Sequence, residues 1–147
     1  MICFADSSAV VKLYAGEEGA DAVRDLSGIA VAQIARVEVP AALWRKHRLA
    51  ELTAEEAGVL TAELEADYFG TDEEPPRFVA VATTAGLLDE AARLCAAHGL
   101  RAYDAVQLAS ALLARALDDS CATIAAFDSS LRGAAAAEGF ALLPAEV

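Results

Sequence analysis

The sequence predicts an α/β fold, in which a short, mostly parallel central sheet of about four or five strands is flanked by helices. Three observations favour this fold. Short apolar runs alternate with longer helix-like segments along the whole chain. The apolar runs are continuous, as in strands buried on both faces of a sheet. The 147 residues contain no internal repeat and no long linker, so we expect one domain over residues 1–147.

The elements of the first half follow from apolar runs and helix signals. The first two strands are expected at residues 2–5 and 29–32. Helices are expected over the segments that follow them, residues 8–14, 17–26 and 35–49. Pro40 lies either in the first turn of the last of these helices or at a kink. Thr53 and Glu56 have the form of a capping box, which predicts a helix from there to about residue 68.

The second half continues the same alternation after a loop at residues 70–76. Strands are expected at residues 78–81 and 121–127, and a small edge strand at residues 141–143. Thr83 or Thr84 caps a helix that Gly99 ends. Two more helices are expected over residues 103–117 and from Asp128 or Ser129 to Gly139.

Composition narrows the class of protein. No apolar run reaches the ~18 residues of a membrane span, so we expect no membrane segment. The first residues lack the basic region of a secretory signal. Cys3, Cys95 and Cys121 are scattered, which is typical of buried thiols in a reducing compartment. We therefore expect a cytoplasmic protein.

The chain is strongly acidic, with a net charge of −12 and a pI of about 4.4. This charge argues against a broad basic surface for nucleic acid, although metal ions and a local basic patch can still dock it. The one dense basic run, Trp44 to Arg48, offers Arg45, Lys46 and Arg48 as contacts for RNA phosphates or for an acidic partner. The alternative is that these side chains form an ordinary solvated helix face.

Two carboxylates follow predicted strands, and ligand-binding residues of a parallel sheet gather at the carboxyl ends of its strands. Asp6 ends the first strand and Asp128 ends the late one. Asp is also a favoured N-cap, and helix starts fall on the same edge. Each junction contains serines that could cap the helix instead. Asp6 and Asp128 are therefore either caps or members of a site.

Two further acids are poorly explained as caps. Glu38 lies among valines and alanines within a helix, and Asp104 precedes an apolar helix face. A partly buried, unpaired carboxylate costs several times the ~0.3–1 kcal/mol that a helix dipole returns. Arg36 or Arg101 could neutralise such acids in a purely structural pair. If all four acids converge, one arginine cannot offset their repulsion, whereas a divalent ion can, and oxygen ligands select Mg²⁺ or Mn²⁺.

Four segments, FADSSAVVKLY, ARVEVPAALWR, RAYDAVQLASAL and AAFDSSLRGAAAAEGF, resemble the acidic motifs of PIN domains in order and spacing. The strongest similarity is to the VapC-type ribonuclease toxins of bacterial toxin–antitoxin pairs. The resemblance runs from Phe4 to about Leu143, and its four acids are 32, 66 and 24 residues apart. Where the family often has a small hydroxyl residue two before the last acid, this chain has Ala126.

The resemblance implies a metal-dependent endoribonuclease that hydrolyses RNA phosphodiester bonds. Asp6, Glu38, Asp104 and Asp128 match the family's catalytic, metal-binding acids, and Ser7 matches a hydroxyl that holds a metal-bound water. One or two Mg²⁺ or Mn²⁺ ions would activate water, and Glu38 or Asp128 would accept its proton. The resemblance also implies a homodimer and a cognate antitoxin whose tail covers the acidic cleft.

Two other functions fit parts of the pattern. One is a PIN-fold interaction module that has lost its chemistry. The other is a receiver-like or phosphatase-like domain in which Asp6 accepts a phosphoryl group. The phosphatase pattern needs a second acid two residues after Asp6, where the chain has Ser8, and the receiver pattern needs an acid pair before it.

Overall fold

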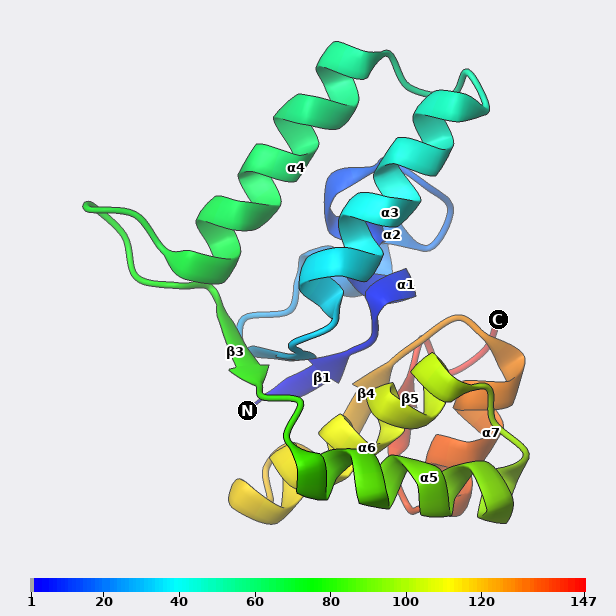
Figure 1. Ribbon diagram of the computed structural model, residues 1–147. Coiled ribbons are helices and arrows are strands. Elements are labelled where there is room, and N and C mark those ends of the chain that lie inside the picture. The colour runs from blue at the N-terminus through cyan, green and yellow to red at the C-terminus, as the bar shows by residue number, and fades with distance from the viewer. Residues whose placement is uncertain (1) are drawn as a thin grey trace.

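The computed structural model describes residues 2–147, and its centre is a fully parallel sheet of five strands (Figure 1). The strands are β1 (Cys3–Ala5), β2 (Ile29–Ala32), β3 (Phe78–Val81), β4 (Thr123–Ala125) and β5 (Ala141–Leu143), in the spatial order β3-β2-β1-β4-β5. This confirms the predicted α/β fold, and each expected strand exists. β3 and β5 are the edge strands.

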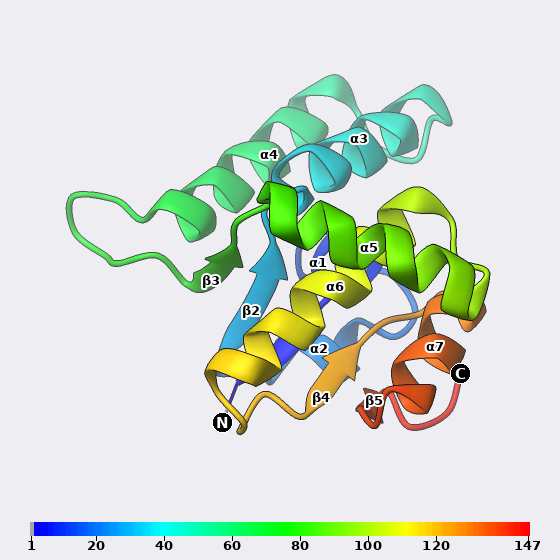
Figure 2. The same ribbon diagram turned by 60° about the horizontal axis from the view of Figure 1, so that its bottom comes forward.

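The described residues form seven helices, which connect the strands and cover both faces of the sheet (Figure 2). Their bounds are α1 (Ser7–Tyr14), α2 (Ala20–Arg24), α3 (Ala35–Arg48), α4 (Ala54–Phe69), α5 (Ala85–His98), α6 (Ala102–Leu117) and α7 (Ser129–Ala137). The capping box of Thr53 and Glu56 is present, and Thr84 caps α5. Pro40 lies inside α3, beyond its first turn.

Two predicted boundaries are wrong for local reasons. The helix expected at residues 17–26 is only α2, because Gly19 before it has a left-handed φ of 89° and passes close to the Phe127 ring. The strand expected at residues 121–127 is only β4. Beyond it the backbone turns toward α7, and the Phe127 N–H donates to the Ser8 hydroxyl instead of to a strand.

Side chains alternate across the sheet and fill two cores. Phe4 packs with α5, α6 and α7 through residues such as Leu94, Leu108 and Leu131. Its neighbours in β1, Cys3 and Ala5, pack on the other face with α1, α3 and α4. Both faces of β1 are therefore buried, as its uninterrupted apolar sequence predicted.

The strand order places β1 at a switch point. The chain passes from β1 to β2 on one side, and later brings β4 in on the other side of β1. In an open parallel sheet, such a point leaves a crevice at the carboxyl ends of the two diverging strands. Asp6 and Asp128 follow β1 and β4, so both lie at this crevice.

No helix among residues 2–147 combines the length and the apolar content that crossing a bilayer requires.

Candidate active site

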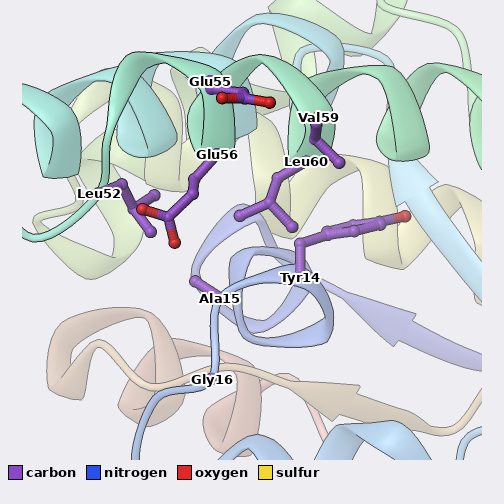
Figure 3. Close-up of a pocket in the computed structure, with 8 residues that line it drawn as sticks. All are labelled: Tyr14, Ala15, Gly16, Leu52, Glu55, Glu56, Val59 and Leu60. Carbon is purple, nitrogen blue, oxygen red and sulfur yellow. The ribbon is translucent and has the colours of Figure 1, made fainter.

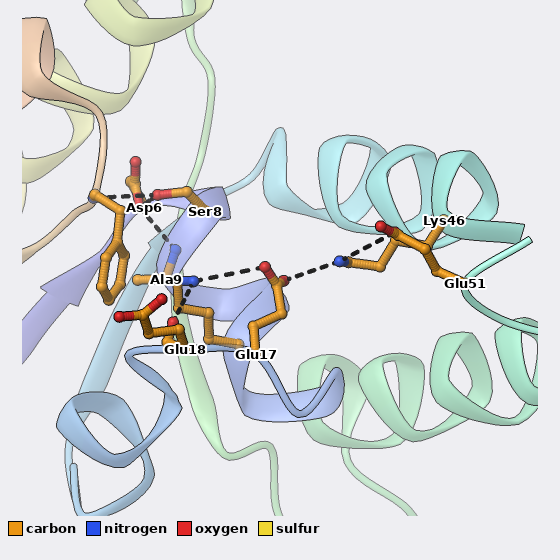
Figure 4. A network of polar contacts seen from close by, with 9 residues as sticks. Asp6, Ser8, Ala9, Glu17, Glu18, Lys46 and Glu51 are labelled. Atoms are coloured by element: carbon orange, nitrogen blue, oxygen red, sulfur yellow. Dashed lines mark hydrogen bonds and ion pairs between the residues drawn. The ribbon is translucent and has the colours of Figure 1, made fainter. Parts of the chain in front are cut away.

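Asp6 is the innermost acid of the crevice, with only 4% of its surface exposed. Its Oδ1 accepts the Ala9 N–H at 2.9 Å and the Ser8 hydroxyl at 2.7 Å (Figure 4). Burial away from water raises the pKa of Asp6 to about 6, although the two hydrogen bonds act in the opposite direction and lower the pKa. The negative charges of Asp104 and Glu38 raise the pKa further. Asp6 therefore lies in the electrostatic field of two of the other predicted acids.

Glu38 is held by neutral donors from two other elements. The Ser7 hydroxyl donates to Glu38 Oε1 at 2.9 Å. The Gln107 Nε2 donates to the same Glu38 oxygen at 2.8 Å and to Ser7 Oγ at 2.9 Å. The Glu38 carboxylate on α3 is thereby fixed to the start of α1 and to α6. Ser7, the hydroxyl residue predicted for the site, donates directly to this carboxylate.

Gln107 was not among the site residues predicted from the sequence, although a signal for it was present. Gln107 is 2% exposed and lies in a stretch of α6 whose other residues are almost all apolar. A buried amide in an apolar stretch needs partners elsewhere in the fold. Its Oε1 is also buried and has no hydrogen-bond partner among residues 2–147.

Asp104 and Asp128 share a cation. The Arg101 Nη2 lies 3.3 Å from Asp104 Oδ2 and 3.5 Å from Asp128 Oδ1. The other oxygen of Asp128, Oδ2, caps α7 by accepting the Leu131 N–H at 2.9 Å. The Arg101 side chain is 80% exposed, whereas those of Asp104 and Asp128 are 19% and 33% exposed. Arg101 therefore closes the site on its solvent side.

The two arginines that the sequence offered as counter-ions, Arg36 and Arg101, have different partners in the structure. Arg36 stacks on Phe69, with its guanidinium 4.4 Å from the ring centroid, and it makes no ion pair within the described part of the chain. Arg101 pairs with two acids, Asp104 and Asp128, and with neither Asp6 nor Glu38 among residues 2–147. A single guanidinium thus balances half of the four predicted acids.

A divalent ion needs several oxygen ligands that converge on one point. In this conformation, no three His, Cys, Asp or Glu side chains of residues 2–147 are grouped closely enough to hold one ion. The chemistry nevertheless fits a hard cation: the site offers only carboxylate, hydroxyl and amide oxygens, including the orphaned acceptor of Gln107. To bind an ion there, the carboxylates would have to come closer together than they are in this conformation.

The predicted basic contacts fall beside a hollow of about 340 Å³ between α1, α3 and the turn after β4. Arg45 and Lys46 line it together with Ser8 and Phe127, and Arg48 is exposed but not part of the lining. Lys46 is bound to Glu17 at 3.3 Å and to Glu51 at 3.7 Å (Figure 4). The hollow thus adjoins the acidic crevice through Ser8, the partner of Asp6.

A second hollow of about 400 Å³ lies between α4 and the turn that follows α1 (Figure 3). Its walls carry Tyr14, Leu60 and Val59 together with the carboxylates of Glu55 and Glu56. None of the predicted site residues lines it, so it contributes nothing to the acidic crevice.

Comparisons with known proteins relate the sequence to one protein family. Residues 3–137 match the family model described as PIN domain. The chain is 35% identical over 150 residues to a protein of Mycobacterium tuberculosis strain CDC 1551 / Oshkosh named Ribonuclease VapC45, covering 99% of this chain and 97% of that protein. Identity and coverage are the same for Ribonuclease VapC49 of strain ATCC 25618 / H37Rv.

Replacing the buried acid should stabilise the metal-free protein at neutral pH. The folded pKa of Asp6, about 6, lies above its unfolded value of 3.8, so folding favours the protonated form. Stability from this group is complete below pH 4 and is lost as the pH rises to about 6, by about 3 kcal/mol. In EDTA, Asp6→Asn should therefore match the wild type at pH 4 and exceed its free energy of unfolding at pH 7, as measured by urea denaturation. Asp21→Asn, at an exposed carboxylate, is the control, and an Asp6→Asn gain that does not grow with pH contradicts the assignment.

Removing the amide of Gln107 should destabilise the fold. Gln107→Leu keeps the side-chain bulk but takes both N–H donors away from Ser7 and Glu38. A partly buried carboxylate that loses a donor costs about 1–3 kcal/mol, which thermal and urea unfolding will measure. Gln33→Leu removes an exposed glutamine that also makes one long-range hydrogen bond, to the Thr83 N–H, and we expect a smaller loss of stability there. Equal losses in the two variants would rule out a special role for Gln107.

Proposed function

The chain belongs to the PIN domain family, and from its acidic crevice we propose that it is a metal-dependent endoribonuclease acting as the toxin of a toxin–antitoxin pair. The observation that carries the proposal is the buried Asp6, which lies in the negative field of Glu38 and Asp104 at a strand-end crevice. A fold keeps so unfavourable a charge where chemistry needs it. Both reported relatives bear the name ribonuclease.

Asp6, Glu38, Asp104 and Asp128 are the residues that would hold Mg²⁺ or Mn²⁺. A divalent ion bound there supplies an acidified water and neutralises charge on the phosphate oxygens. The protein orients its own carboxylates for this role: Ala9 and Ser8 fix Asp6, and the start of α7 fixes Asp128. Glu38 or Asp128 would accept the proton of the attacking water, and the Ser7 hydroxyl, which donates to Glu38 Oε1, would hold a water at this point.

The hollow beside Ser8 supports a path for the RNA backbone. Arg45 lines it and is exposed, so it is available to a phosphate. Lys46 must first exchange its carboxylate partners for the phosphate, and Arg48 would act from outside the hollow. We propose that Arg45 contributes most among the three.

Metal-dependent RNA cleavage tests the proposal. Purified protein is incubated with total RNA and Mg²⁺ or Mn²⁺, and the products are separated on a denaturing gel. We expect cleavage by the wild type, no cleavage in EDTA, and none with Asp104→Asn, because that variant lacks one of the four acids. Metal should raise the melting temperature of the wild type and not that of Asp104→Asn.

Asp21→Asn is the matched control for this assay, because its carboxylate is fully exposed and lies on α2. It should cleave at the wild-type rate. Equal cleavage by wild type and Asp104→Asn would refute the role of Asp104, and cleavage in EDTA would refute the need for metal.

We also propose that the protein forms a homodimer and binds a cognate antitoxin in the cytoplasm. The net charge of −12 suits an antitoxin segment with a basic side chain that enters the acidic crevice. Neutralising Asp104 and Asp128 together should weaken binding to that antitoxin and flatten its dependence on salt, as measured by calorimetry at 50 and 300 mM NaCl. Unchanged affinity and salt dependence would contradict the crevice as the antitoxin site.

One observation favours a second candidate, a PIN-fold module without activity. Arg101 already pairs with Asp104 and Asp128, as expected of a purely structural ion pair. The RNA assay separates the candidates, since such a module cleaves neither with nor without metal.

A further inference from the structure

The four acids of the crevice do not have equivalent partners. Asp6 is held by a hydroxyl and a backbone N–H, and Glu38 by a hydroxyl and an amide, all of them neutral. Asp104 and Asp128 instead face one full positive charge, the guanidinium of Arg101. Neutral donors can stay in place and orient the carboxylates when a cation binds. A guanidinium cannot, because it would stand against a divalent ion of the same sign.

We propose that Arg101 is a built-in counter-ion of the metal-free site, which competes with the divalent ion for Asp104 and Asp128 and is displaced when the ion binds. Its Nη2 lies between the two carboxylates, 3.3 and 3.5 Å from their nearest oxygens. A cation that joins Asp104 to Asp128 needs this position. This inference rests on the proposed function, because it assumes that the crevice binds metal.

The placement of Arg101 makes the exchange feasible. The residue is the N-cap of α6, three positions before Asp104, and its side chain is 80% exposed. Rotation about its side-chain torsions moves the guanidinium into water without disturbing either core. The cost of displacement is that of breaking exposed ion pairs, which is small. Arg101 thus holds two acids together in the empty site at little cost to later metal binding.

The test is direct titration of metal-free protein with Mn²⁺, with free Mn²⁺ followed by electron paramagnetic resonance and no RNA present. Arg101→Gln should bind Mn²⁺ about two- to fivefold more tightly than the wild type, the scale expected from an exposed ion pair. Arg101→Lys keeps the charge but loses Nε, which also donates to Asp104 at 3.3 Å, so its Kd should lie between those of the wild type and Arg101→Gln. In EDTA, Arg101→Gln should melt slightly below the wild type, because Asp104 and Asp128 then repel without a counter-ion.

Arg93→Gln is the matched control. Arg93 also makes an i,i+3 ion pair on a helix surface, with Glu90 at 2.6 Å, and its side chain is 58% exposed. It should leave the Kd for Mn²⁺ unchanged. If wild type and Arg93→Gln bind Mn²⁺ and Arg101→Gln binds no more tightly, the counter-ion role is wrong while the proposed function stands. If none of these proteins binds Mn²⁺, the metal site itself, and with it the proposed function, is wrong.

Discussion

The structure depends on one unfavourable placement, a carboxylate kept out of water where β1 ends. Asp6 is buried between strands that diverge on either side of β1, and the fold must supply donors for it there. The first turn of α1 does so through Ala9 and Ser8, and the Ser8 hydroxyl also accepts the Phe127 N–H, which ties the end of β4 to the same point. Because β2 leads into α3 and β4 into α7, the helices that follow these strands also bring Glu38 and Asp128 to the crevice.

Two of the candidate site residues are also helix caps. Asp6 and Asp128 are both N-caps, so the simplest structural explanation of each is correct, yet it does not exclude a functional one. The two carboxylate oxygens of Asp128 have different partners: Oδ2 accepts the Leu131 N–H, and Oδ1 faces the Arg101 guanidinium. A cap fixes the carboxylate in position, and the positive ends of α1 and α7 lower the cost of negative charge at the crevice. Local helix chemistry thereby fixes both carboxylates at the crevice, where the proposed metal ion would bind.

Features set by neighbouring residues were predictable from the sequence, and features set by distant ones were not. Apolar runs and caps such as Thr53 and Thr84 depend on a few adjacent residues, so the strands and most helices could be predicted. The hydrogen bonds of Gln107 reach 69 and 100 residues along the chain, and its apolar neighbours in α6 indicate that it is buried without indicating which residues it contacts. Arg101 reaches Asp128 across 27 residues, and the sequence left it as one of two possible counter-ions. Such pairings exist only once the sheet has formed.

The same charge balance bears on how an acidic chain can use an anionic substrate. Two lysines near the crevice are already paired with a carboxylate of the same chain. Lys12 and Lys46 both pair with Glu17, and Lys12 also lies over the Phe127 ring. Few cations are left to release counter-ions from RNA, so electrostatic affinity for the backbone is small and varies little with salt. In the proposed metal-dependent ribonuclease, most of the positive charge at the crevice would come from a bound metal ion. The ion that activates water would then also make the crevice attractive to a phosphate, so substrate binding and chemistry would depend on the same ion.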